Sequence, residues 1–193
     1  MKKLLITGFE PFGGEMTNPS WDALSLIPNV VGDFELTKLE IPVFFGLAAE
    51  IIIKKAEEIA ADCILCIGLA GGRDAITPEM IGINLRYARI PDNNGNEPCD
   101  EKISEKGENA YFTTFPARKI ADAICEKKIP SKVSYSAGAY VCNDVIYSLL
   151  EHFDKSETKV GFIHVPYSKE QYKEPSMPLS DISTAIITAI ESI

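Results

Sequence analysis

The chain has 193 residues, of which 46% are hydrophobic and 24% are charged, the composition of an ordinary globular protein. Its 28 acidic and 19 basic residues give a formal net charge of −9, which argues against nucleic acid or an anionic membrane as the main partner. No apolar run approaches the roughly 20 residues that cross a bilayer, and the apolar start is too short for a signal peptide. The sequence therefore predicts a cytoplasmic protein.

The first half of the chain alternates short apolar segments with helical patterns. We expect strands at residues 2–7, 34–41 and 63–68, helices at 21–27 and 45–61, and weaker strand character at 80–87. In the second of these helices, apolar residues recur at the three- and four-residue spacing of an amphipathic helix. Glycine-rich turns at 8–14 and 68–73 follow the first and third strands, where open α/β sheets bind ligands.

A long polar segment opens the second half. Residues 89–107 are rich in proline, glycine, asparagine and acids, which predicts a loop of the kind that is usually functional or at an interface. Beyond it we expect helices at 116–128, 142–153 and 179–193, and strands at 132–136 and 159–165. The alternation predicts one domain, residues 1–193, with an α/β fold: a three-layer α/β/α sandwich around a largely parallel, mixed, twisted sheet.

The five cysteines do not suggest a disulfide framework, because their number is odd and their spacing is scattered. Cys63 and Cys66 form a Cys-x-x-Cys pair within one continuous apolar strand. Residues three apart in a strand point to opposite faces, so these two thiols are not expected to pair or to share a metal. The sequence predicts no metal site, and two small buried hydrophobic side chains instead.

Cys142 is the candidate nucleophile among the five thiols. It follows a strand and a turn of small residues, and it lies at the start of a predicted helix. A helix N-terminus lowers the pKa of a thiol, and backbone N–H groups of the same turn could hold a developing oxyanion. Position alone leaves open the alternative that Cys142 is packed as a small hydrophobic side chain.

The chain has only two histidines from which a general base could come. His164 ends an apolar strand at the edge where ligands bind, whereas His152 falls late in the helix of Cys142, where a solvated or capping role is expected. His164 is therefore the better candidate. The carboxylate that would orient its imidazole stays open, because 28 acids are available and Glu79, Asp92 and Asp144 are all candidates.

These residues lie within motifs that resemble those of the pyroglutamyl peptidase I family, the C15 cysteine peptidases. The matching stretches run in the family's order: 5–14 (LITGFEPFGG), 68–73 (GLAGGR), 76–79 (ITPE), 83–84 (IN), 88–93 (ARIPDN), 110–112 (AYF), 136–138 (SAG), 141–143 (VCN) and 161–167 (GFIHVPY). Leu69 is a departure, since some relatives carry Gln there.

The resemblance implies a site and an activity. The triad would be Glu79, Cys142 and His164, of which Glu79 comes from the resemblance alone. Other positions implied are the substrate-binding residues Phe9, Phe12, Asn18, Leu69 and Ile90, with Arg89 supporting the oxyanion. The expected protein is a single-domain cysteine exopeptidase that removes N-terminal pyroglutamate from peptides, needs no cofactor, and forms a homodimer or homotetramer.

Two other classes of function remain open at this point. A non-catalytic small-molecule binding domain would use the same fold with Cys142 merely packed. A nucleoside phosphorylase-like transferase would also use a similar sandwich, since fold alone does not fix function. Such a transferase needs a phosphate site, and neither glycine-rich turn matches a phosphate-binding motif.

Overall fold

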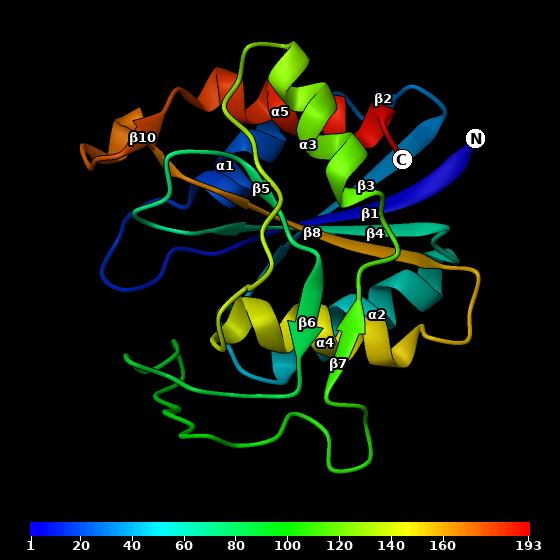
Figure 1. The fold of residues 1–193 in the computed structure, drawn as a ribbon, viewed down its shortest axis with the longest axis vertical. Helices are drawn as coiled ribbons and strands as arrows, with labels where there is room; N and C mark the ends of the chain where they lie inside the picture. The colour runs from blue at the N-terminus through cyan, green and yellow to red at the C-terminus, as the bar shows by residue number, and fades with distance from the viewer.

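The computed structural model describes residues 1–193 and is built around a six-stranded sheet with the order β2-β3-β1-β4-β8-β5 (Figure 1). Its four parallel strands are β1 (Lys2–Phe9), β3 (Phe34–Ile41), β4 (Cys63–Leu69) and β8 (Lys159–Val165). Two short antiparallel strands flank them, β2 (Val30–Val31) and β5 (Thr77–Pro78). The central strands are almost wholly buried, as expected for parallel strands covered on both faces.

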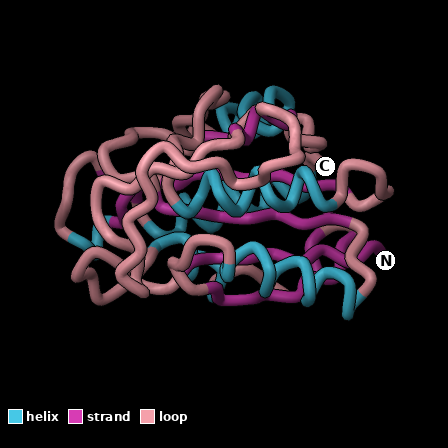
Figure 2. The backbone as a smooth tube through the Cα atoms, turned by 90° about the horizontal axis from the view of Figure 1, so that it is seen from below, coloured by secondary structure: helices cyan, strands magenta, loops and turns pink.

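Helices cover both faces of this sheet. One face is covered by α1 (Pro19–Ser25), α3 (Ala117–Glu126) and α5 (Leu179–Glu191), and the other by α2 (Leu47–Ile59) and α4 (Val141–His152). This is the three-layer sandwich that the sequence predicts. Helices and strands run in roughly the same direction, and many loops gather at the end opposite the N-terminus, where the parallel strands finish (Figure 2).

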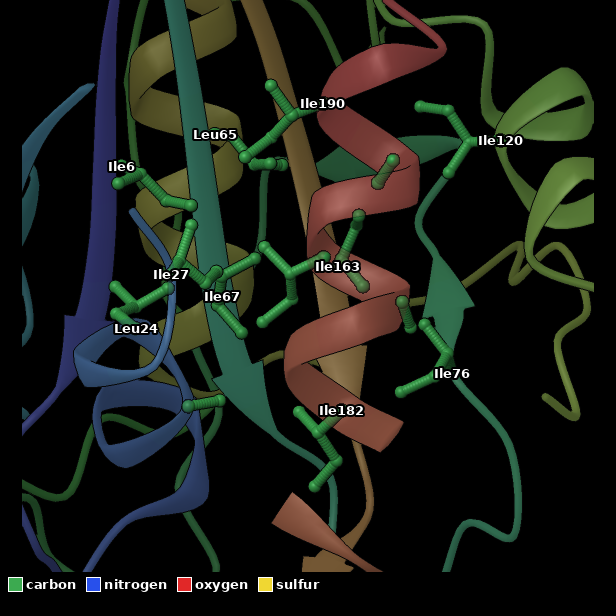
Figure 3. Close-up of a cluster of buried hydrophobic side chains, with 14 of the residues drawn as sticks. Ile6, Leu24, Ile27, Leu65, Ile67, Ile76, Ile120, Ile163, Ile182 and Ile190 are labelled. Atoms are coloured by element: carbon green, nitrogen blue, oxygen red, sulfur yellow. The ribbon is translucent and has the colours of Figure 1, made fainter. Parts of the chain in front are cut away.

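Two separate hydrophobic clusters fill the spaces between the layers. The cluster beneath α1, α3 and α5 is rich in isoleucine and leucine, and Figure 3 shows side chains of the sheet and of α5 that meet there. Cys63 belongs to this cluster, whereas Cys66 belongs to the cluster beneath α2 and α4. The prediction that these two thiols point to opposite faces is confirmed.

Several short elements lie outside the main sheet. Antiparallel β6 (Ile81–Ile83) and β7 (Ala110–Phe112) pack against α4, and β9 (Tyr167–Ser168) pairs with β10 (Ser176–Met177) around a 3₁₀ turn at Lys169–Gln171. The strand character predicted at 80–87 is thus limited to β6 and an isolated bridge between Arg86 and Glu101. Residues 89–107 form a loop, as predicted. None of the helices is both long and apolar enough to span a membrane.

The strand predicted at 132–136 is wrong, and a proline explains why. This segment runs parallel to β5: N–H of Lys132 donates to O of Ile76 (3.1 Å), and N–H of Ser134 donates to O of Pro78 (2.9 Å). The hydrogen bond between these two would need an N–H on Pro78, which proline lacks. Only isolated β-bridges form on either side of this missing hydrogen bond.

Candidate active site

Cys142 and His164 both lie beside Gly68 at the end of β4. Gly68 is the direct strand neighbour of His164, and a Cβ built on Gly68 would lie 3.0 Å from Sγ of Cys142. The absence of a side chain at Gly68 therefore leaves the space that the thiol occupies. The structure brings together the two residues that the sequence selects.

The start of α4 places Cys142 at this strand end. Gly138 adopts φ +78°, a left-handed conformation that suits glycine, in the turn that leads into the helix. Tyr140 is the N-cap residue and supplies no side-chain hydrogen bond to the first turn. Cys142 is the second residue of the helix, so its N–H belongs to the group that has no partner within the helix.

Glu79 forms a buried pair with His164. Oε1 of Glu79 lies 2.7 Å from Nδ1 of His164, and both side chains are almost inaccessible to solvent. The short antiparallel pairing of β5 with β8 holds them there, and N–H of Glu79 donates to O of Phe162 (2.9 Å). A carboxylate at Nδ1 fixes the tautomer that carries its proton on Nδ1, which leaves Nε2 as a base.

Arg73 also contacts this carboxylate. Its Nη1 donates to the same Oε1 of Glu79 over 2.7 Å, and its Nη2 donates to O of Ser136 over 3.1 Å. Arg73 is not among the site residues predicted from the sequence, although it ends the glycine-rich turn after β4. A cationic residue in that turn, at the ligand-binding edge of the sheet, is the sequence feature from which Arg73 could be predicted.

The pKa values of Glu79 and His164 favour an anion beside a neutral imidazole. Burial by itself raises the pKa of Glu79, but the hydrogen bonds with His164 and Arg73 outweigh it and leave the pKa below its usual range. Burial lowers the pKa of His164, and Glu79 offsets this effect only in part. At neutral pH His164 is therefore able to accept a proton.

The backbone N–H at the helix N-terminus lowers the pKa of Cys142 as expected, but other effects outweigh it. Burial, followed by the negative charge of Glu79, raises its pKa to about 12, while Arg73 and the backbone N–H of Cys142 oppose this. Cys142 is half-buried rather than exposed. Thiol and imidazole therefore rest in their neutral forms, and the thiol needs His164 to take its proton at the moment of attack.

A small apolar cavity opens beside the thiol. It is lined by Phe9, Phe12, Asn18, Val43, Leu69, Tyr140, Val141 and Cys142. Four of the five residues that the resemblance assigns to substrate binding are in this set. Val43 and Tyr140 are additional: the first lies just beyond the end of β3 and the second just before α4.

The polar groups of Asn18 serve the protein itself in this structure. Its Oδ1 accepts from N–H (3.1 Å) and Oγ (2.8 Å) of Ser20 and caps α1, while its Nδ2 donates to O of Glu10 (2.9 Å). Asn18 is buried, so these contacts brace the turn that carries Phe9 and Phe12.

Ile90 and Arg89 lie in a neighbouring surface depression rather than in the cavity of Cys142. Phe12 and Tyr140 form walls of both hollows, and both Ile90 and Arg89 are exposed. The hydroxyl of Tyr140 donates to O of Pro91 (3.0 Å) and ties this loop to the start of α4.

His152 is separate from the site. It lies at the end of α4, where Nε2 is 3.0 Å from Oε1 of Glu57 on α2, and its side chain is exposed. This agrees with the solvated role expected from the sequence. No group of three or more histidine, cysteine, aspartate or glutamate side chains is arranged to hold a metal ion.

Comparisons with known proteins give a consistent result. A family model described as pyroglutamyl peptidase matches residues 2–193. Pyrrolidone-carboxylate peptidase of Staphylococcus saprophyticus is 43% identical over 99% of this chain and 92% of its own length. Pyrrolidone-carboxylate peptidase 1 of Caldanaerobacter subterraneus is 45% identical, over 99% of this chain and 97% of its own length.

Solved structures agree with these relatives. The crystal structure of Bacillus amyloliquefaciens pyroglutamyl peptidase I superposes with a TM-score of 0.94 at 40% identity, covering 100% of this chain and 96% of the other. Pyrrolidone carboxyl peptidase from Thermococcus litoralis gives a TM-score of 0.95 at 38% identity, covering 100% of this chain and 93% of the other.

Proposed function

Because the chain belongs to the pyroglutamyl peptidase family, we propose that Cys142, His164 and Glu79 are the catalytic triad with which it removes N-terminal pyroglutamate from peptides. The observation that carries this proposal is that Cys142 and His164 both lie beside Gly68, with Glu79 hydrogen-bonded to Nδ1 of the imidazole. A nucleophile, a base and the group that orients the base are the three parts that acyl transfer needs.

The reaction begins when Nε2 of His164 takes the thiol proton and Sγ of Cys142 attacks the carbonyl that joins pyroglutamate to the next residue. The N–H of Cys142 is positioned to stabilise the oxyanion, because it has no partner within the helix. The tetrahedral intermediate collapses as His164 gives the proton to the leaving amine. Water then hydrolyses the thioester, again with His164 as the base.

The lining of the cavity explains the preference for pyroglutamate. Pyroglutamate is a flat, neutral lactam, and the cavity presents the aromatic rings of Phe9 and Phe12 with no acidic or basic side chain in its wall. A peptide with an ordinary N-terminus would place its ammonium group there without a counter-charge, which is costly. Leu69 and Asn18 are proposed as further contacts to the lactam, Ile90 as a contact to the substrate from the neighbouring depression, and Arg89 as a support of the oxyanion region.

The comparisons identify an enzyme over the whole described chain, so the binding-domain and phosphorylase-like alternatives are not pursued. We further propose that residues 1–193 work as one peptidase domain in the cytoplasm, and that the protein is a homodimer or homotetramer. Tyr87 and Ile90, which are exposed at the start of the long loop, support that loop as a contact between copies. Sedimentation equilibrium would test the assembly.

Hydrolysis of a fluorogenic pyroglutamyl amide tests the proposed function. The matched substrate is the corresponding prolyl amide, which has the same ring with a charged amine in place of the lactam. We expect the wild-type protein to cleave only the pyroglutamyl amide, and Cys142→Ser to cleave neither while retaining the wild-type circular dichroism spectrum. A wild-type protein that does not cleave the pyroglutamyl amide, or a fully active Cys142→Ser, would contradict the proposal.

A further inference from the structure

We propose that Arg73 is a positioning residue of the active site, whose guanidinium holds the Glu79 carboxylate where it orients His164. This inference rests on the proposed triad. Arg73 does not line the cavity beside Cys142, so it acts through Glu79 rather than on the substrate.

The contacts of Arg73 join three separate segments around the triad. Nη1 donates to Oε1 of Glu79 and to Oγ1 of Thr77, and Nη2 donates to O of Ser136. Arg73 itself ends the turn after β4, Thr77 belongs to β5, and Ser136 lies in the segment that leads into α4. One side chain therefore connects the carboxylate to the backbone that carries the nucleophile.

Glu79 needs a cation at this point. Its side chain is wholly buried, whereas that of Arg73 is 28% exposed and its guanidinium approaches from the rim. His164 is the other hydrogen-bonding partner of Oε1, and it is neutral in the resting site. A buried carboxylate without a counter-charge is strongly destabilised, so Arg73 adds to the hydrogen bond from His164 in keeping Glu79 ionised next to the imidazole.

The geometry requires a guanidinium in particular. Arg73 donates to a carboxylate and to a carbonyl from two different nitrogens, which a planar fork can do and an ammonium on a flexible stem does less well. A lysine at this position would keep the charge near Glu79 but would not hold both acceptors in the same way.

The charge of Arg73 also acts on the imidazole. It lowers the pKa of His164, against the effect of Glu79. It also contributes to the low pKa of Glu79. Removal of this charge should raise both pKa values. His164 would then be protonated, and unable to act as a base, at a higher pH than in the wild-type protein.

The test compares Arg73→Met, Arg73→Lys and the wild-type protein in hydrolysis of the pyroglutamyl amide across pH 5–10. In Arg73→Met we expect kcat to fall by about 10- to 100-fold, as for other groups that orient an active-site ligand, with KM little changed. The acid limb of the pH profile, which is the range in which kcat/KM falls as the pH is lowered, should move to higher pH. Arg73→Lys should restore the wild-type position of this limb while kcat stays intermediate.

The matched control is Arg118→Met. Arg118 lies on the exposed side of α3, contacts the hydroxyl of Tyr135, and should tolerate the change with wild-type kinetics. Should Arg73→Met fail to fold by circular dichroism, Arg73→Gln takes its place, because it keeps a donor for Glu79 without the charge, and it must show the same displaced limb.

The inference and the proposed function fail in different ways. If the wild-type protein is active and the acid limb stays in place in the neutral Arg73 variant, the inference is overturned. Arg73 would then have a structural role alone, whatever the change in kcat. A wild-type protein without activity on the pyroglutamyl amide would overturn the proposed function itself. A displaced limb that Arg73→Lys does not restore would also overturn the role assigned to the charge.

Discussion

Nδ1 of His164 donates to Oε1 of Glu79 over 2.7 Å, and the two side chains are buried together. This contact has a direct chemical consequence, because a proton held on Nδ1 leaves the lone pair of Nε2 free for the thiol. The two residues are 85 positions apart in the chain: Glu79 directly follows β5, and His164 lies near the end of β8. The catalytic geometry therefore depends on a strand of only two residues.

Replacement of His164 by alanine should remove the base. We expect kcat/KM for the pyroglutamyl amide to fall by about 10²–10⁴-fold, the usual contribution of a positioned acid–base group. His152→Ala is the matched control, since His152 is exposed at the end of α4, where it contacts Glu57 and Phe153. Equal losses in the two variants would show that His164 is not the base.

Replacement of Glu79 by glutamine should separate orientation from charge. The amide keeps the size of the carboxylate but lets His164 adopt the wrong tautomer, so kcat should fall by roughly 10²-fold or more. Glu79 raises the pKa of His164, so loss of its charge should lower that pKa and move the acid limb of kcat/KM to lower pH.

This shift is opposite in sign to that expected for Arg73→Met. The two variants measured side by side over the same pH range provide each other's control, since a general loss of structure would not move the limbs in opposite directions. A wild-type rate in Glu79→Gln would assign the orienting role to another group.

The reactivity of Cys142 toward iodoacetamide should report its raised pKa. The thiolate is the form that alkylates, so with a pKa of about 12 the rate should climb steadily between pH 7 and 10 without reaching a plateau. Peptide mapping by mass spectrometry separates Cys142 from the exposed Cys99 and Cys125.

Glu79→Gln sharpens this experiment. The charge of Glu79 raises the pKa of Cys142, so its removal should speed alkylation of Cys142 while it slows hydrolysis of the amide. A rate that levels off below pH 8 in the wild-type protein would instead indicate a thiolate–imidazolium pair at rest.

Some parts of this site can be predicted from sequence and others cannot, for physical reasons. Cys142 and His164 can be predicted because a helix start and a strand end are local patterns, and parallel strands bring such ends to one edge of the sheet. Glu79 cannot be predicted in this way, since its placement depends on the pairing of a two-residue strand that contains a proline. The resemblance to a known family supplies Glu79 where local patterns do not.

The pKa values in the site are harder to predict from the sequence than the positions of its residues. The helix start at Cys142 suggests a lowered pKa, but the burial of the thiol and the charge of Glu79 raise the pKa by more than the helix start lowers it. Neither is a property of the residues near Cys142 in sequence. The proline at 78 likewise interrupts a strand pairing whose other partner, 132–136, lies some fifty residues away.

The last prediction concerns Gly68, whose missing side chain makes room for the nucleophile. A Cβ at this position would lie 2.8 Å from Cζ of Phe162 and 3.0 Å from Sγ of Cys142, so both must move. Displacement of a reacting group by about 1 Å costs roughly 10²-fold in rate, and we expect a loss of kcat/KM on that order in Gly68→Ala.

Gly32→Ala is the control for this substitution. Gly32 has open space around it but adopts φ +53°, so alanine there should cost about 1–2 kcal/mol of stability through backbone strain, with activity unchanged. Thermal melts and amide hydrolysis, measured on both variants, separate the two effects. If Gly68→Ala were less stable yet as active as Gly32→Ala, the thiol would not occupy the space above Gly68 during catalysis.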